Sequence, residues 1–153
     1  MCIRDRYKSF IVGSGYLKEK ILKFIRENNL SDKLIHIDYT RKAMQYLNQC
    51  DLFILSSKFE GLPNVLLEAQ LLKKFIISTN CPTGPKEILL NGKAGDLIDS
   101  NNPKTLTQKI INFHKNKKKI LKKKKILLGY NQLQRFDFNV NCKKYLNLIK
   151  RVI

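Results

Sequence analysis

The chain has 153 residues, which is enough for one domain with a buried core. Its hydrophobic content of 43% excludes an intrinsically disordered chain, and no apolar run approaches the ~20 residues that a membrane-spanning helix needs. The formal net charge of +18 fits nucleic acid, an anionic membrane face or a phosphate-bearing ligand as a partner, so composition alone does not choose between them.

Short apolar runs alternate with segments of helical period along most of the chain. The runs typical of buried strands are residues 9–12, 34–37, 51–55, 75–78 and 97–98. The segments that follow them predict helices over residues 16–29, 41–48, 64–72 and 86–90, and then a helix initiated by Pro103 that runs into a lysine-rich segment.

This alternation predicts the α/β class, with a Rossmann-like parallel sheet covered by helices on both faces. Ligands of such open sheets bind at the carboxyl ends of the strands, where the loops gather. We therefore expect residues 13–15, 56–64 and 80–84 to share one rim of the sheet.

The ends of the chain differ from its middle in composition. Residues 1–6 (MCIRDR) have no pattern that continues into the domain, and we interpret them as a non-native leader. Residues 7–153 are expected to form one domain, with residues 104–153 as a basic helical tail. The tail contains KNKKKILKKKK over residues 115–125, which is typical of a solvated face and would also attract anionic lipid.

The spacing of the cysteines bears on the redox environment of the chain. None of the four cysteines is paired with another in a spacing such as C-x-x-C; they are Cys2, Cys50, Cys81 and Cys142. This spacing favours free thiols in a reducing cytoplasm, and no cluster of ligand-type residues indicates a metal site.

The segment FEGLPNVLLEA, residues 59–69, carries most of the chemistry. Gly61 is expected to let the backbone turn sharply, and Pro63 suits the first position of the helix that follows. The free N–H groups of that helix N-terminus suit a phosphate, and Glu60 and Glu68 flank it. A nucleotide sugar has hydroxyls at both ends and phosphate in the middle. The alternative is that Glu68 pairs with a neighbouring lysine and Glu60 is merely solvated.

Glu60 and Glu68 are separated by seven residues, and EGLPNVLLEA resembles the E-x7-E signature of the retaining glycosyltransferases of group 1, or family 4. The resemblance implies the GT-B architecture of two Rossmann-like domains with a cleft between them, and it places this chain in the carboxyl-terminal, donor-binding domain. By the same resemblance Glu68 holds the donor ribose hydroxyls and Glu60 contacts the donor sugar as the catalytic residue. The resemblance also implies that backbone N–H groups around Leu62, Pro63, Asn64 and Val65 bind the diphosphate.

Four further segments extend the resemblance from about residue 7 to residue 109, and one of them, GDLI at residues 95–98, matches the usual G-x-L-V element. IVGSGYL at residues 11–17 is similar to the V-G-x-G-P element and adds Gly13 and Gly15 to the donor site, with Gly61 as the third glycine. CPTGPKEI at residues 81–88 is similar to the P-x-G-P-x-E-I version of bacterial members that build surface polysaccharide. Residues 34–39 occupy the place of a loop near the base, with Asp38 where glycine is common.

The resemblance implies a hexosyl-type transferase that moves a sugar from a nucleotide diphosphate sugar to an acceptor sugar or a polyprenyl-linked glycan. It implies no metal and no other cofactor. The unpaired cysteines favour a cytoplasmic location, and the lysine run would allow peripheral contact with the inner face of the membrane. The segment that would precede residue 7 carries the acceptor domain and an Arg and a Lys that stabilise the leaving diphosphate in this family, so we expect the isolated chain to be inactive.

Two other readings compete with this one. A sugar-nucleotide epimerase has GT-B halves of the same kind, and EGLPNVLLEA argues against it. A basic nucleic-acid-binding or membrane-binding module would use the lysines, but no aromatic residues are interleaved with them to stack on bases. We therefore expect no nucleic-acid partner.

Overall fold

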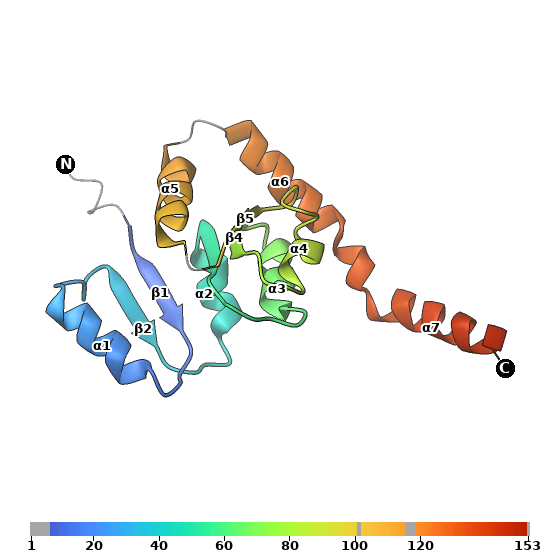
Figure 1. Cartoon of the computed structure of the whole chain (residues 1–153), viewed down its shortest axis with the longest axis horizontal. Helices are drawn as coiled ribbons and strands as arrows, with labels where there is room; N and C mark the ends of the chain where they lie inside the picture. Colours follow the sequence, from blue (N-terminus) through green and yellow to red (C-terminus); the bar gives the residue numbers. More distant parts are fainter. Residues whose placement is uncertain (1–6, 101, 116–118, 153) are drawn as a thin grey trace. The chain divides into compact units, whose positions relative to one another are not determined.

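A computed structural model describes residues 7–100, 102–115 and 119–152 (Figure 1). The interpretation of residues 1–6 as a leader falls outside them. The described residues form two compact units, which divide between Gln49 and Cys50.

The amino-terminal unit is built on two parallel strands. β1 (Ser9–Val12) pairs with β2 (Leu34–Ile37), with Ser9 opposite Leu34 and Val12 opposite Ile37. α1 (Lys18–Glu27) connects the strands and buries Ile25, and α2 (Ala43–Gln49) follows β2 and buries Leu47. α1 begins two residues later than predicted, because the chain still turns at Tyr16, where the Lys18 N–H donates to the Gly15 carbonyl.

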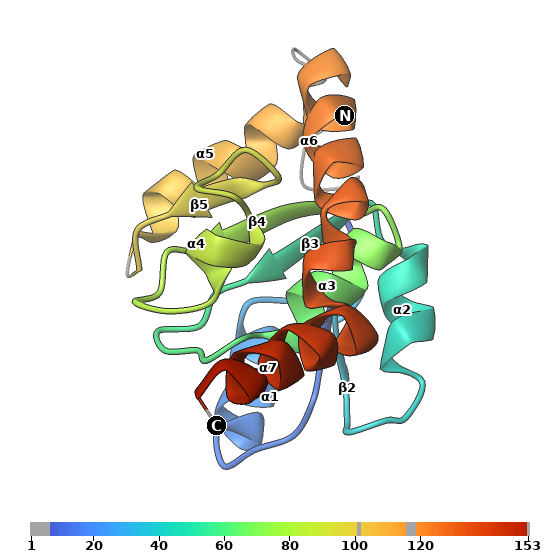
Figure 2. The ribbon, with the colours of Figure 1, turned by 90° about the vertical axis from the view of Figure 1, so that its right-hand side faces the viewer.

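The carboxyl-terminal unit contains a three-stranded parallel sheet in the order β3 (Leu52–Leu55), β4 (Phe75–Thr79), β5 (Asp96–Ile98). Figure 2 shows these strands side by side, with the fainter, more distant α5 behind them. The helices of this unit are α3 (Asn64–Leu71), α4 (Pro85–Ile88), α5 (Pro103–His114), α6 (Lys119–Asn131), the short 3-10 helix η2 (Leu133–Phe136) and α7 (Phe138–Val152).

Strand β4 forms the core of this unit. All five of its residues are buried, since it pairs with a strand on each side and has helices packed against it. Phe75 and Ile77 form an apolar cluster with Ile98 of β5. The half-buried side chains packed against this cluster are Leu52, Leu106, Ile110, Phe113 and Ile126. Removing one of the fully buried side chains would cost about 2–5 kcal/mol.

The five predicted strands and the parallel pairing within each sheet are confirmed. The prediction that the Pro103 helix runs into the lysine-rich segment is wrong, because α5 ends at His114 and a separate helix, α6, begins at Lys119. Among the described residues, none of the helices is both long enough and apolar enough to span a membrane.

Candidate functional site

Two loops meet at the carboxyl ends of β3 and β4, as the sequence predicts. Three side chains at the end of β4 or just after it donate to backbone carbonyls of the loop after β3. The Thr79 hydroxyl donates to the Ser57 carbonyl at 2.5 Å, and the Cys81 thiol donates to the same carbonyl at 3.1 Å. The Thr83 hydroxyl donates to the Glu60 carbonyl at 2.5 Å. The predicted third part of the rim, residues 13–15, belongs to the other unit, and its place beside these loops stays a prediction.

Gly84 makes the closest approach between the two loops. Its φ of 85° lies in the left-handed region, and a Cβ built on it would overlap the Gly61 carbonyl oxygen and lie 2.6 Å from Pro63 Cδ. Only glycine has room at this position. The chain does bend at Gly61, as predicted, but the bend does not require a glycine there, because Gly61 has no positive φ and a Cβ added to it would meet open space. The steric demand falls on Gly84 instead.

Helix α3 begins directly behind this contact. Pro63 is the N-cap residue with an extended ψ of 99°, so the prediction that it occupies the first helical position is wrong by one residue. Its carbonyl accepts the Leu66 N–H at 2.9 Å, and no side chain caps the helix. The N–H groups of the first turn, which Asn64 and Val65 provide, therefore point out of an uncapped helix end with a partial positive charge.

Glu60 and Glu68 lie on the two sides of this helix end in sequence. Glu60 is half-buried on the loop, and Glu68 is half-buried on α3, next to the buried Ala69 and Gln70. Within the part of the chain that the structure describes, neither carboxylate makes an ion pair or a hydrogen bond. The alternative that Glu68 pairs with a neighbouring lysine is therefore wrong. Both carboxylates are available to a ligand.

A buried side-chain amide on α3 joins this helix to α4. The Gln70 side chain is 3% exposed, and its Nε2 donates to the Ile88 carbonyl at the end of α4 at 3.2 Å. A Cβ on Gly129 of α6 would lie 2.9 Å from the same nitrogen, so α6 approaches α3 closely at this point. The sequence reasoning missed Gln70, although a lone amide in an otherwise apolar helix was a usable signal.

The glycine loop of the amino-terminal unit is held by the loop after β2. Gly13 has a φ of 135°, and its N–H donates to the Ile37 carbonyl at 2.9 Å. Ser14 Oγ accepts the Tyr39 N–H at 3.1 Å, and Lys18 Nζ lies 2.7 Å from an Asp38 carboxylate oxygen. The hydrogen bond from Lys18 holds the pKa of Asp38 below its ordinary value. The carboxylate that replaces the usual glycine is thus occupied by a lysine, and Gly15 beside it is exposed.

Two lysines of the lysine-rich segment have structural roles that the sequence reasoning missed. Lys125 Nζ contacts an Asp96 carboxylate oxygen at 2.5 Å and the carbonyls of Gly92 and Gly95 at 2.9 Å each, while Lys109 Nζ lies 3.0 Å from the other Asp96 oxygen. Burial raises the pKa of Asp96, but the hydrogen bonds from the two lysines outweigh it and the net pKa is lowered. These contacts tie α5 and α6 to β5.

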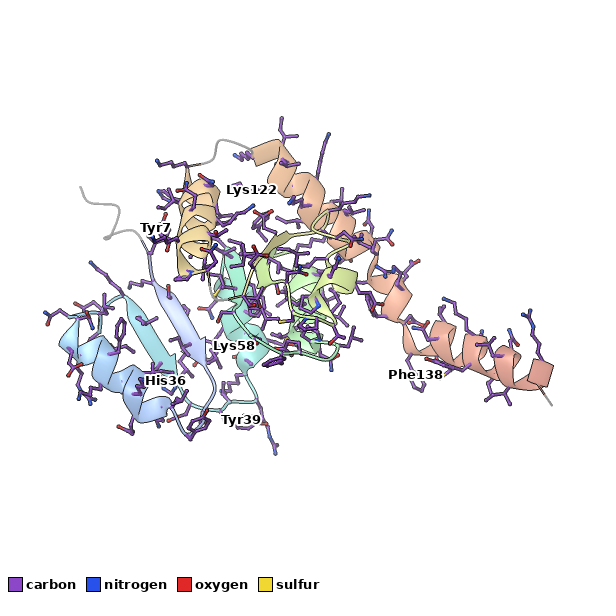
Figure 3. The ribbon with its side chains drawn as sticks, in the orientation of Figure 1. Tyr7, His36, Tyr39, Lys58, Lys122 and Phe138 are labelled. Carbon is purple, nitrogen blue, oxygen red and sulfur yellow. The ribbon has the colours of Figure 1, made fainter. Side chains whose placement is uncertain are left out.

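Lys122, labelled in Figure 3, is the other lysine of the lysine-rich segment that has a structural role. Its Nζ lies 4.2 Å from the centre of the Phe113 ring and donates to the Phe113 carbonyl. A cavity of about 410 Å³ lies between α5, α6 and the sheet, at the end of β5 where Asp96 begins the strand. The basic segment is therefore only partly a solvated face.

The described cysteines are free thiols, as the sequence predicts for Cys50, Cys81 and Cys142. Burial raises the pKa of the Cys50 thiol. Among the described residues no group of three or more His, Cys, Asp and Glu side chains could hold a metal ion. The expectation that the chemistry needs no metal stays a prediction.

Comparison with known proteins adds the last evidence. The profile of the family described as "Glycosyl transferases group 1" matches residues 3–128. An uncharacterized glycosyltransferase of Methanocaldococcus jannaschii is 39% identical over 82 residues, which cover 54% of this chain and 20% of that protein. The N-acetylgalactosamine-N,N'-diacetylbacillosaminyl-diphospho-undecaprenol 4-alpha-N-acetylgalactosaminyltransferase of Campylobacter jejuni is 29% identical over 106 residues, which cover 69% of this chain and 29% of the enzyme.

A solved structure agrees with these relatives. A variant of S. aureus TarM, crystallised with UDP among other ligands, superimposes with a TM-score of 0.81 at 26% identity, over 92% of this chain and 28% of that one. The chain thus spans less than a third of the length of these three proteins.

Proposed function

The chain belongs to the glycosyl transferases of group 1, and on that premise we propose that it binds a nucleotide diphosphate sugar at the carboxyl ends of β3 and β4. One observation carries the proposal: Glu60 and Glu68 have no partner among the residues that the structure describes, and an uncapped helix N-terminus lies between them in sequence. A ligand with hydroxyls on both sides of a diphosphate complements that arrangement.

Each candidate residue has a role in this proposal. Glu68 accepts hydrogen bonds from the ribose hydroxyls, and Glu60 contacts the sugar as the catalytic residue. The diphosphate binds at the start of α3, at the backbone of the segment Gly61, Leu62, Pro63, Asn64 and Val65, where every residue but Pro63 has an N–H to donate. Gly13 and Gly15, which the family resemblance adds to the donor site, belong to the other unit, and their part in it stays a prediction. The sugar then passes to an acceptor hydroxyl with retention, and the leaving diphosphate is stabilised electrostatically.

The first test removes the ribose contact. In Glu68→Ala the affinity for UDP, measured by calorimetry, should fall more than tenfold, because losing a charge-assisted hydrogen bond costs roughly 1.5–3 kcal/mol. UDP is the nucleotide crystallised with the TarM variant. Glu87→Ala is the control, since Glu87 is an exposed carboxylate of the same unit, 3.8 Å from Arg135. An unchanged UDP affinity in Glu68→Ala would refute the ribose assignment.

For the acceptor we propose a sugar or a polyprenyl-linked glycan, approached by peripheral contact with the cytoplasmic face of an anionic membrane. The C. jejuni relative is named for a diphospho-undecaprenol-linked substrate. On α6, Ile120 is 74% exposed and Leu127 is 55% exposed, two helical turns apart on one face. The exposed lysines of this helix surround them: Lys119, Lys123 and Lys124. From Pro103 to the end of the chain Asp137 is the only acidic residue, so little opposes attraction to anionic lipid.

The vesicle test replaces two of these lysines. Lys123→Gln with Lys124→Gln should lower partitioning into phosphatidylglycerol-containing vesicles roughly thirtyfold, since each lysine near the surface contributes about 1 kcal/mol. Lys8→Gln with Lys20→Gln makes the same charge change at exposed positions of the other unit and should have a smaller effect. Equal losses in both double variants would argue against the α6 face. Tighter binding to single-stranded DNA than to vesicles would favour nucleic acid instead.

A further inference from the structure

The loop that carries Glu60 is held at separate points by the last residue of β4 and by residues that follow it. The contacts from Thr79 and Cys81 both fall on the Ser57 carbonyl, at the start of the loop. The Thr83 hydroxyl reaches the Glu60 carbonyl itself, and Gly84 packs against the next carbonyl, that of Gly61. The Thr83 hydroxyl therefore holds the peptide plane of the Glu60 carbonyl, and the turn at Gly84 packs against the next peptide plane.

The Glu60 side chain has no such support. It makes no hydrogen bond or ion pair of its own within the described residues, so the direction of its Cα–Cβ bond depends on the backbone that Thr83 and Gly84 hold. A backbone carbonyl and the side chain of the same residue rotate about the same Cα, so a bond to the carbonyl restricts where the carboxylate can point. Glu68 lies on α3 and is positioned separately, by the packing of Ala69 and Gln70.

We infer that Thr83 is a positioning residue for the donor sugar, and that it acts through the Glu60 backbone. This inference rests on the proposed donor site. The Thr83 hydroxyl orients the Glu60 carboxylate toward the sugar, whereas it does not touch Glu68 or the N–H groups of the first turn of α3, which bind the ribose and most of the diphosphate. Its hydrogen bond also fixes the peptide plane that carries the Gly61 N–H, one of the diphosphate donors. Thr83 therefore affects the preference for a nucleotide sugar over its nucleoside diphosphate more strongly than it affects the affinity for the diphosphate itself.

The experiment measures both affinities in the same variants. Calorimetry on this chain measures the affinity for UDP-glucose, UDP-N-acetylglucosamine, UDP-N-acetylgalactosamine and GDP-mannose, each relative to its own nucleoside diphosphate. The nucleotide sugar with the largest gain in affinity over its diphosphate in the unaltered chain is then used for the variants. In Thr83→Val, which keeps the β-branched shape and loses the hydroxyl, the gain from the sugar should fall about three- to tenfold, with the diphosphate affinity within about twofold. Thr83→Ser keeps a hydroxyl and should restore the gain.

A double-mutant cycle with Glu60→Gln separates positioning from general damage. If Thr83 acts through Glu60, Thr83→Val should have no further effect once the Glu60 charge is gone. Equal losses of sugar and diphosphate affinity in Thr83→Val, additive effects in the cycle, or no gain from any sugar in the unaltered chain would each overturn the inference while leaving the donor site standing. Failure of the unaltered chain to bind any nucleotide would instead overturn the proposed function.

Discussion

Gly84→Ala is expected to destabilise the carboxyl-terminal unit by about 3–5 kcal/mol, as the sum of a disfavoured backbone conformation and an overpacked contact. The residue has a φ of 85° and a ψ of −72°, which side chains with a Cβ rarely adopt. The added methyl would overlap the Gly61 carbonyl and press on the rigid Pro63 ring, so no flexible side chain can move aside. Urea denaturation followed by circular dichroism would measure the loss.

Gly61→Ala is the matched control, because it adds the same methyl to the other side of the same contact. Gly61 has no positive φ and open space beside it, so the variant should lose less than about 1 kcal/mol. A loss of less than about 1 kcal/mol in Gly84→Ala as well would mean that the contact between the two loops is not as close as described. In Gly84→Ala the loop that carries Glu60 should also shift, and nucleotide-sugar affinity should fall with it.

The strands could be predicted from the sequence because each is a short apolar run whose burial follows from local composition. The run at Phe75 becomes the buried central strand, and the run at Ser9 pairs at the predicted boundaries. The break between α5 and α6 could not be predicted in the same way. Leucine and lysine are good helix formers on both sides of it, and they outweigh the weak end signals that the sequence offers, His114 in the last turn and Asn116 two positions later.

The candidate site shows the same division between local and long-range information. The spacing of Glu60 and Glu68 and the start of α3 are local, and the sequence located them to within one residue. The steric role of Gly84 and the hydrogen bond from Thr83 join positions 23 residues apart. Which of two glycines must lack a side chain depends on how two loops meet, and only the folded chain contains that information.

The ion pairs of Asp96 also depend on long-range information. In the sequence, Asp96 is one residue of a G-x-L-V-like element, and the lysine-rich segment is typical of a solvated face that would also attract anionic lipid. In the structure it is the shared partner of Lys109 and Lys125, which come from two different helices. The lysine-rich segment is therefore mixed: Lys125 is tied to Asp96 and stabilises the fold, while Lys123 and Lys124 are exposed.

Asp96→Asn should destabilise the carboxyl-terminal unit by about 2–4 kcal/mol, because it leaves two partly buried ammonium groups without their counter-ion. The Asp96 side chain is 17% exposed, and those of Lys125 and Lys109 are 19% and 37% exposed. Asp99→Asn makes the same charge change at an exposed position nearby and should cost less than about 0.5 kcal/mol. Lys125→Met should cost more than Lys109→Met, since Lys125 also donates to two carbonyls.

The same carboxylate should give the unit a distinct response to acid. The pKa of Asp96 is lowered in the folded chain, so the unfolded chain binds its proton first as the pH falls. The stabilisation is complete above the unfolded pKa of about 3.9 and is lost as the pH drops from there through the lowered folded value. Denaturation of the unaltered chain and of Asp96→Asn at several pH values below about 5 should give free energies of unfolding that converge toward low pH. A constant difference between them across that range would place the stabilisation in packing, because a charge interaction must disappear once the carboxyl is protonated.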